Sequence, residues 1–204
     1  MKLYDFPGAP NPRRLRIFMA EKGIKVPLEQ LEILKGAGRT PEFLKKNPFG
    51  GIPLLELDDG SYLAESVAIC RYLEGLHPEP NLMGKDFREQ ALIEMWQRRA
   101  ELSLFGSIGR AFQNTNPIIA PVIGQQFPEY GAKQLATAQQ TLAVFDAQLK
   151  GKEFIAGPRY TIADITALVA IEFGKQNAGL QLDPALKEIA RWHQAVSSRP
   201  SAKA

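Results

Sequence analysis

The residues of this chain that are best suited to chemistry lie between Ile52 and Ser66. Glu65 and Ser66 stand at the start of a helix predicted over 66–76. The Ser66 hydroxyl and the unpaired N–H groups of the first turn can bind an anion there. The Glu65 carboxylate can take an amino group. The pair also suits a structural role, because serine is a favourable N-cap and an acidic side chain favours the positive end of a helix.

Pro53 is the second notable residue, because it follows Ile52 at the entrance of a predicted strand. Proline cannot donate to a sheet ladder, so it is unfavourable inside a sheet. Taken alone, Pro53 is explained by a position on an edge strand. Because Glu65 and Ser66 follow twelve residues later, a role in binding is favoured instead.

The elements that position these residues predict a small α/β domain. Leu15, Phe18 and Met19 line one face of a helix between two strands, and this β-α-β order favours a parallel pair. Two apolar runs joined through Asp58-Asp59-Gly60 then predict a hairpin. The predicted elements are strand 2–6, helix 12–22, strand 26–34, a short helix at 40–46, the hairpin 52–64 and helix 66–76.

The second half of the chain predicts helices only. A proline-rich linker, "HPEPNLMG", begins at His77, and no convincing strand follows it. Thr161 and Asp164 are expected to form a capping box with a structural role, at the start of an apolar helix that is predicted to be central and buried. The other predicted helices are 86–113, 129–149 and 184–198.

Composition and charge limit the class of protein. With 204 residues, 45% of them hydrophobic and 23% charged, the chain has the composition of a soluble globular protein. It contains no apolar run of about 18 residues and begins without a secretory signal, so we expect a cytoplasmic protein with no membrane partner. The net charge is +3, and the only basic cluster is Arg13, Arg14 and Arg16. This pattern favours a local basic cleft for a small anion over nucleic-acid binding.

The chain has few other residues that could act as a nucleophile or bind a metal, namely one cysteine and two histidines. Cys70 lies within a packed helix and is expected to be an inert core thiol. Being the only cysteine, it cannot form an intramolecular disulfide. His77 and His193 have no third ligand near them, so no metal site is expected.

The chain resembles the cytosolic glutathione transferase family, and most closely its bacterial nu-like and theta-like members. The stretches 9–24, 47–73 and 154–165, together with the proline linker, carry this resemblance. It implies an α/β thioredoxin-like N-terminal domain over 1–77, a linker over 78–85 and an all-α C-terminal domain over 86–204. It also implies a homodimer.

The resemblance further implies an enzyme that binds glutathione and presents its thiolate to a small hydrophobic electrophile. Glutathione is the co-substrate, and no prosthetic group is expected. In the family the peptide bond before the proline at the position of Pro53 is cis. This bond directs the backbone N–H and C=O of Ile52 to the cysteinyl residue of glutathione. Glu65 and Ser66 then take the α-amino group and the carboxylate of the γ-glutamyl residue.

The group that stabilises the thiolate departs from the family pattern. Ala9 occupies the usual Ser/Thr position, so no hydroxyl is available there. We expect the Asn11 side chain to donate to the sulfur instead, helped by backbone N–H groups that open the following helix. Two alternatives stay open: Asn11 only caps that helix, or the hydroxyl of Tyr4 takes the role.

The sequence is less specific about which residues bind the glycyl carboxylate of glutathione and the electrophile. Gly51 replaces a lysine that many relatives use for the glycyl carboxylate, so Lys35, Arg39, Lys45 or a basic residue of a partner subunit are candidates. The expected electrophile pocket consists of Phe6, Trp96, Arg99 and Phe112, although such aromatic residues often belong simply to the core.

Two other functions compete with the transferase. One is a disulfide reductase that uses two glutathione molecules, and the other is a non-catalytic interaction module built on the same fold. The missing hydroxyl at Ala9 favours the module, whereas the intact Ile52-Pro53 and Glu65-Ser66 pairs oppose it.

Overall fold

The computed structural model describes all 204 residues, which form two compact units. Unit 1 comprises Met1–Pro80 together with Lys203 and Ala204, and unit 2 comprises Asn81–Ala202. The boundary falls within the proline-rich segment that the sequence predicts as a linker.

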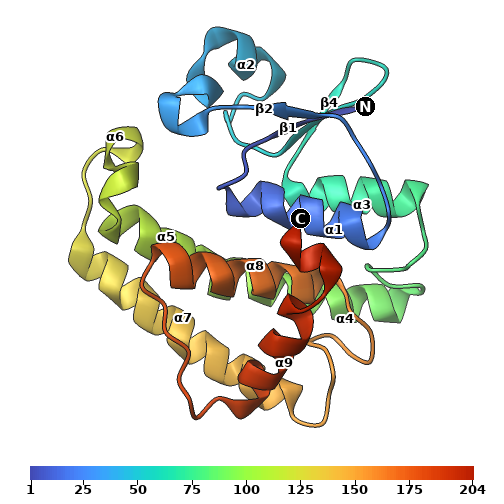
Figure 1. Ribbon diagram of the computed structural model, residues 1–204, viewed down its shortest axis with the longest axis vertical. Coiled ribbons are helices and arrows are strands. Elements are labelled where there is room, and N and C mark those ends of the chain that lie inside the picture. The colour runs from blue at the N-terminus through green and yellow to red at the C-terminus, as the bar shows by residue number, and fades with distance from the viewer. The chain divides into compact units, whose positions relative to one another are not determined.

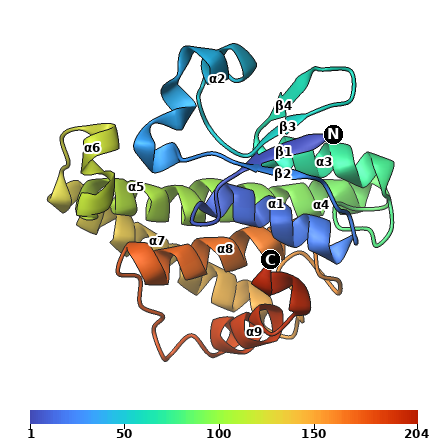
Figure 2. The same ribbon diagram turned by 45° about the horizontal axis from the view of Figure 1, so that its top comes forward.

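Unit 1 is a four-stranded sheet with helices on both faces (Figures 1 and 2). The strand order is β2-β1-β3-β4, in which β1 and β2 are parallel and β3 is antiparallel to both β1 and β4. Helices α1 and α3 lie on one face of the sheet and α2 lies on the other side. The elements are β1 (Lys2–Asp5), α1 (Pro10–Glu21), β2 (Leu28–Gln30), 3-10 turns at Ile33–Lys35 and Ala37–Arg39, α2 (Pro41–Lys46), β3 (Leu54–Glu56), β4 (Tyr62–Ala64) and α3 (Ser66–Leu76).

The predicted β-α-β unit and hairpin are confirmed, but the second strand is shorter than predicted. It covers Leu28–Gln30 rather than 26–34, and all three of its residues are exposed. After Gln30 the chain leaves the sheet and forms two 3-10 turns. Gly36, at φ 82°, lies between them. The apolar residues Ile33 and Leu34 therefore belong to the first 3-10 turn and not to the strand.

Unit 2 contains helices and no strand. Helices α4 (Phe87–Arg98) and α5 (Gly106–Thr115) are joined by a π-helical segment, Arg99–Phe105. The prediction that 86–113 is helical is confirmed, while the π-helical turns in the middle are a feature that hydrophobic spacing does not reveal. The other elements are a 3-10 turn at Pro117–Ile119, α6 (Ala120–Ile123), α7 (Pro128–Leu149), α8 (Ile162–Asn177), α9 (Lys187–Ser197) and a 3-10 turn at Pro200–Lys203.

Helix α8 is the centre of unit 2, as predicted. It contacts α4, the π-helical segment, α5 and α9, and every residue of its first half is buried. Thr161 and Asp164 form the predicted capping box. None of the helices combines the length and hydrophobicity that crossing a lipid bilayer requires.

The Asp164 carboxylate joins three parts of unit 2. Oδ1 accepts hydrogen bonds from Ile155 N–H and from Trp192 Nε1 on α9, both at 2.9 Å. Oδ2 accepts from the N–H and the hydroxyl of Thr161, at 3.0 and 3.1 Å. The side chain is fully buried, and burial raises the pKa of its carboxyl to about 6. Four donors and one buried anion therefore fix the start of α8 against α9 and the preceding loop.

The substitution Asp164→Ala is expected to lower the free energy of unfolding by about 3–5 kcal/mol, because it leaves several buried donors without an acceptor. Urea denaturation followed by tryptophan fluorescence measures this loss, and Glu153→Ala at an exposed position is the control. A loss below about 1 kcal/mol would contradict the assigned role.

The same carboxyl predicts a pH dependence. Its folded-state pKa lies above the ordinary value of 3.8, so it contributes stability that is complete below about pH 4 and lost as the pH rises through about 6. The difference in unfolding free energy between wild type and Asp164→Ala is therefore expected to be larger at pH 5 than at pH 7, by about 1 kcal/mol. A difference that is constant over this range, measured by urea denaturation at both pH values, would argue against the raised pKa.

Candidate functional site

Unit 1 contains a pocket of about 120 Å³ where the starts of α1, β3 and α3 meet. It brings together five of the residues that the sequence singles out, namely Asn11, Ile52, Pro53, Glu65 and Ser66. Asn47, Phe49 and Gly51 complete the lining. This volume accepts part of a small peptide rather than a whole tripeptide.

The Ile52–Pro53 peptide bond is cis, as the family resemblance implies. Strand β3 begins at Leu54, so Pro53 precedes the ladder and no sheet hydrogen bond is lost at this position. The backbone N–H and C=O of Ile52 have no hydrogen-bond partner within the chain. Both groups are thus available to an extended ligand backbone beside the sheet.

Glu65 is the only residue other than glycine with a positive φ, at φ 66° and ψ 111°. Such a conformation costs about 1–3 kcal/mol, and residues that adopt it are concentrated at functional sites. Glu65 is the N-cap of α3, so the alternative in which Ser66 is the cap is wrong. The Glu65 side chain makes no capping hydrogen bond and is exposed at the pocket.

Ser66 is buried, and its hydroxyl is oriented by Arg14. Arg14 Nη1 donates to Ser66 Oγ at 2.8 Å, and the Arg14 side chain is itself 1% exposed. Because Oγ accepts this bond, its own O–H proton can be donated to a ligand in the pocket. The guanidinium also places a positive charge behind the hydroxyl, which favours a carboxylate there.

Of the three clustered arginines, the structure places Arg14 next to the pocket, and the local basic cleft stays a prediction. Arg14 is buried beneath the pocket and acts on it through Ser66. Arg16 is engaged elsewhere, because its Nη1 bonds to Asp5 Oδ1 at 2.5 Å and its Nη2 to the carbonyl of Pro7. The sequence revealed the cluster but did not identify Arg14 as the member that serves the site.

Asn11 is the second residue of α1, and the interpretation that it caps the helix is wrong. The N-cap is Ala9, and the Asn11 side chain makes no hydrogen bond within the chain. The expected help from following backbone N–H groups is also absent. Pro10 and Pro12 carry no N–H, and Arg13 N–H bonds to the carbonyl of Ala9 at 3.2 Å. The available donors at this helix start are therefore the side-chain amide and the N–H of Asn11.

Tyr4, the alternative donor, lies outside the pocket lining. Its hydroxyl donates to Glu56 Oε2 at 2.8 Å and accepts a hydrogen bond from Lys46 Nζ. Its ring is buried, in edge contact with Phe43. Tyr4 thus packs within the sheet and against α2. Of the two candidate donors, only Asn11 lines the pocket.

The loop before Pro53 is shaped by Asn47, which the sequence reasoning missed. Asn47 is buried, donates from Nδ2 to the carbonyl of Gly51 at 2.8 Å, and accepts at Oδ1 from Phe49 N–H at 3.2 Å. Its backbone partners follow it by two and four residues, a spacing typical of an asparagine side chain that organises a turn. This spacing is the sequence signal by which Asn47 could be found.

Two glycines bring the preceding loop against the same turn. A Cβ atom on Gly38 would lie 2.4 Å from the carbonyl oxygen of Gly50, so neither position tolerates a side chain without movement. This contact places Arg39 next to the turn, where Nη1 donates to the carbonyl of Phe49 at 3.3 Å. Lys35 is exposed and lies 3.7 Å from Glu32. Neither cation is part of the pocket lining.

Three of the four residues expected around the electrophile lie in unit 2, and the fourth, Phe6, lies in unit 1. In unit 2, Trp96 is buried edge-on against Phe145 at 5.5 Å, and the Arg99 guanidinium lies 4.5 Å from the Trp96 ring centre. Phe112 is half-buried and contacts Phe173 at 5.0 Å. Phe6 is half-buried in unit 1. Their role in electrophile binding stays a prediction.

Cys70 is confirmed as a buried thiol. It is 0% exposed on α3, and burial raises its pKa far above the ordinary value. A thiol in this state is a poor nucleophile, because the thiolate is the reactive form.

Comparison with known proteins places the chain in a family. The model for the N-terminal domain of glutathione S-transferases matches residues 3–81, and the model for their C-terminal domain matches residues 113–200. Glutathione S-transferase 2 of Saccharomyces cerevisiae is 35% identical, over 100% of this chain and 88% of that protein. The chain belongs to the glutathione S-transferase family. The predicted family and its enzyme class, a glutathione transferase, are thus confirmed.

Solved structures of this family confirm the predicted fold class. Gtt2 of Saccharomyces cerevisiae has a TM-score of 0.94 at 35% identity, over 100% of this chain and 99% of that chain. A glutathione S-transferase domain-containing protein of Marinobacter aquaeolei VT8 has a TM-score of 0.94 at 39% identity, over 98% of this chain and 99% of that chain. Assignment to the nu-like or theta-like branch stays a prediction.

The substitution Asn47→Ala is expected to lower the free energy of unfolding by about 1–3 kcal/mol, because both hydrogen bonds that hold the turn are lost. Urea denaturation followed by circular dichroism measures the change. Asn11→Ala is the matched control, since that asparagine is exposed and makes no side-chain bond within the chain, and it is expected to change stability by less than about 0.5 kcal/mol. Equal stability of the two variants would contradict the role of Asn47.

Proposed function

We propose that the pocket at the starts of α1, β3 and α3 is the glutathione site of this transferase. The observation that carries the proposal is the convergence of unpaired backbone groups, an acidic side chain and a donor hydroxyl in one cavity. Glutathione presents a complementary set, because it has a peptide backbone, an α-amino group and a carboxylate at its γ-glutamyl end.

The γ-glutamyl end binds at α3. Its carboxylate accepts from the Ser66 hydroxyl, which Arg14 orients from below, and its ammonium pairs with the Glu65 carboxylate. The cysteinyl residue pairs with the N–H and C=O of Ile52. Arg39 is the better supported of the two cations proposed for the glycyl carboxylate, because it already contacts the turn that lines the pocket, whereas Lys35 lies beside Glu32.

The sulfur then faces the start of α1. The amide of Asn11, with the N–H of the same residue, donates hydrogen bonds that favour the thiolate over the thiol. The thiol proton passes to solvent, and the sulfur attacks a small hydrophobic electrophile, forming an S–C bond while the leaving group departs with its electron pair. No covalent intermediate with the enzyme forms, so catalysis rests on positioning and on a lowered thiol pKa.

The substitution Asn11→Ala is expected to lower kcat/KM for an aryl halide about tenfold to hundredfold, since one donor to the reacting anion is lost. The pH profile of kcat/KM should move to higher pH as the pKa of bound glutathione returns toward about 8.5. Ser66→Ala should instead raise KM for glutathione with a smaller change in kcat. Unchanged activity in Asn11→Ala would remove the assignment of the thiolate donor.

One assay panel tests the function as a whole. The wild-type protein is expected to be retained on immobilised glutathione and to turn over 1-chloro-2,4-dinitrobenzene faster than bis(2-hydroxyethyl) disulfide. Faster turnover of the disulfide would favour the reductase, and neither capture nor turnover would contradict the proposed site.

We also propose that the protein is a homodimer and acts in the cytoplasm. A stripe on α4 and the π-helical segment leaves Leu92, Met95 and Leu102 exposed, and unit 1 exposes 82% of Phe49. Apolar side chains gathered on one helix surface favour a protein interface. The single, buried cysteine suits a reducing compartment.

The substitution Leu102→Glu is expected to shift the protein from dimer to monomer in sedimentation velocity, because it places a charge in the apolar stripe. Leu76→Glu, at an exposed leucine of α3, is the control and should leave the mass unchanged. A monomeric wild-type protein would contradict the dimer.

A further inference from the structure

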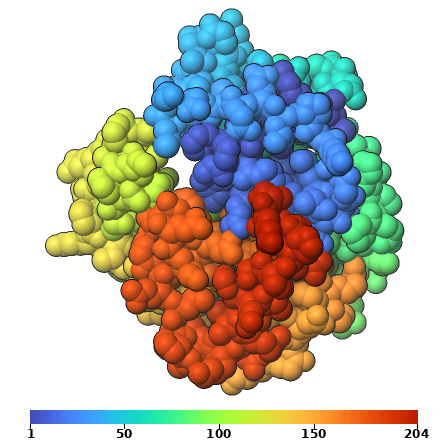
Figure 3. All heavy atoms as spheres, viewed as in Figure 1, coloured from blue at the N-terminus to red at the C-terminus, as the bar shows by residue number.

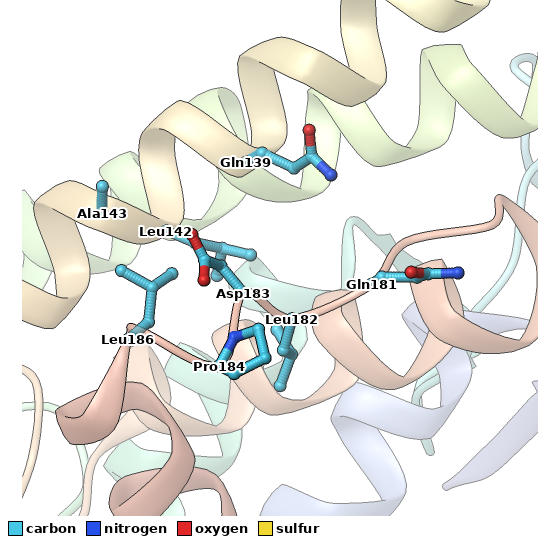
Figure 4. Close-up of a pocket in the computed structure, with 8 residues that line it drawn as sticks. All are labelled: Gln139, Leu142, Ala143, Gln181, Leu182, Asp183, Pro184 and Leu186. Carbon is cyan, nitrogen blue, oxygen red and sulfur yellow. The ribbon is translucent and has the colours of Figure 1, made fainter.

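A second pocket, of about 340 Å³, lies in unit 2 between α7 and the segment that joins α8 to α9 (Figure 4). Helix α7 contributes Gln139, Leu142 and Ala143, and the joining segment contributes the residues from Gln181 to Pro184 together with Leu186. None of these residues belongs to the proposed glutathione site. The volume lies within the range of about 300–1,000 Å³ that is typical of small-molecule sites.

Hydrogen bonds anchor the segment that joins α8 to α9 at two places. Asp183 Oδ1 accepts from Ala185 N–H at 2.8 Å, which fixes the turn that forms one wall. At the end of this segment, Asp146 of α7 accepts from the N–H groups of Glu188 and Ile189 at 2.9 and 3.0 Å. The second interaction caps the start of α9 and ties it to α7, so the segment is fixed both at Asp183 and where α9 begins.

The interior combines an apolar surface with one charge. Leu182 and Leu186 are half-buried and offer an apolar surface to a ligand, and Leu142, which is 1% exposed, lies beneath them. Asp183 is the only charged residue in the lining, and it forms no ion pair. Figure 4 shows its carboxylate extending toward α7.

The polar groups at the rim are not used by the protein itself. The side-chain amides of Gln139 and Gln181 make no hydrogen bond within the chain, and Oδ2 of Asp183 has no partner. The C-terminal part of unit 2, orange to red in Figure 3, forms outer surface in that view. A carboxylate without a counter-ion, next to an apolar surface, complements a ligand that is cationic at one end and apolar at the other.

We propose that this pocket binds a small organic cation, a protonated amine carried by an aromatic or branched aliphatic body. The ammonium group donates to Asp183 Oδ2 and to an amide oxygen of Gln139 or Gln181, while the apolar body covers Leu182 and Leu186. Anionic ligands, glutathione among them, are disfavoured by the same carboxylate. The proposal does not depend on the function of the pocket in unit 1.

The probe is 1-naphthylmethylamine at pH 7.5, with 1-naphthalenemethanol as a neutral analogue of nearly the same shape. Isothermal titration calorimetry on the full-length protein is expected to give a Kd for the amine that is at least about fivefold lower than for the alcohol. Asp183→Asn keeps an oxygen acceptor for Ala185 N–H and removes the charge. It should therefore raise the Kd of the amine to that of the alcohol and leave the alcohol unchanged.

A second variant tests the place of binding. Ala143→Phe fills the pocket from the exposed surface of α7 and is expected to abolish binding of both probes. Ala147→Phe, one turn further along the same helix and outside the lining, is the matched control and should leave both affinities unchanged. Equal affinities for amine and alcohol in the wild-type protein, or amine binding that survives Ala143→Phe, would overturn the proposal. If Ala143→Phe fails to fold, the comparison of amine and alcohol binding in Asp183→Asn still tests the proposal.

Discussion

The hydrogen bond between Arg14 and Ser66 is the interaction on which the proposed glutathione site most depends. It joins α1 to α3, the two helices that pack on one face of the sheet, and it is buried at both ends. A guanidinium removed from water needs acceptors, so it fixes where the start of α3 lies relative to α1. The distance between Asn11 on one helix and Glu65 on the other follows from this contact. A buried charge beneath the pocket therefore fixes the position of Ser66 in its lining.

Most of the fold follows from local signals in the sequence. The apolar spacing of the helix containing Leu15 and Phe18, the Asp59-Gly60 turn and the Thr161–Asp164 box each act within a few residues, and the structure contains the elements that they predict. The failures have a common origin, since they concern features that tertiary contacts decide. The short β2 strand and the π-helical segment cannot be distinguished from longer regular elements by hydrophobic period alone.

The candidate site divides in the same way. Ile52, Pro53, Glu65 and Ser66 are recognisable from their spacing, and the structure brings them together with Asn11. The two residues whose hydrogen bonds shape the site, Arg14 and Asn47, cannot be recognised from a local sequence motif. Arg14 stood in a cluster whose neighbour Arg16 bonds to Asp5, and Asn47 stood in a loop with no motif of its own. Which of three neighbouring arginines is buried depends on the packing of α1 against the sheet and α3, and no local pattern reports it.

The two prolines that flank Asn11 also determine which anions the start of α1 can accept. A helix that begins with ordinary residues offers several N–H groups and can surround the three oxygens of a phosphate. Here Pro10 and Pro12 leave a single backbone N–H among the first three positions. One such donor, with one side-chain amide, is too few for a phosphate or sulfate but enough for an anion whose charge sits on one large atom. In the proposed site, the start of α1 therefore favours the glutathione sulfur over phosphate or sulfate, because it offers too few donors for an oxyanion.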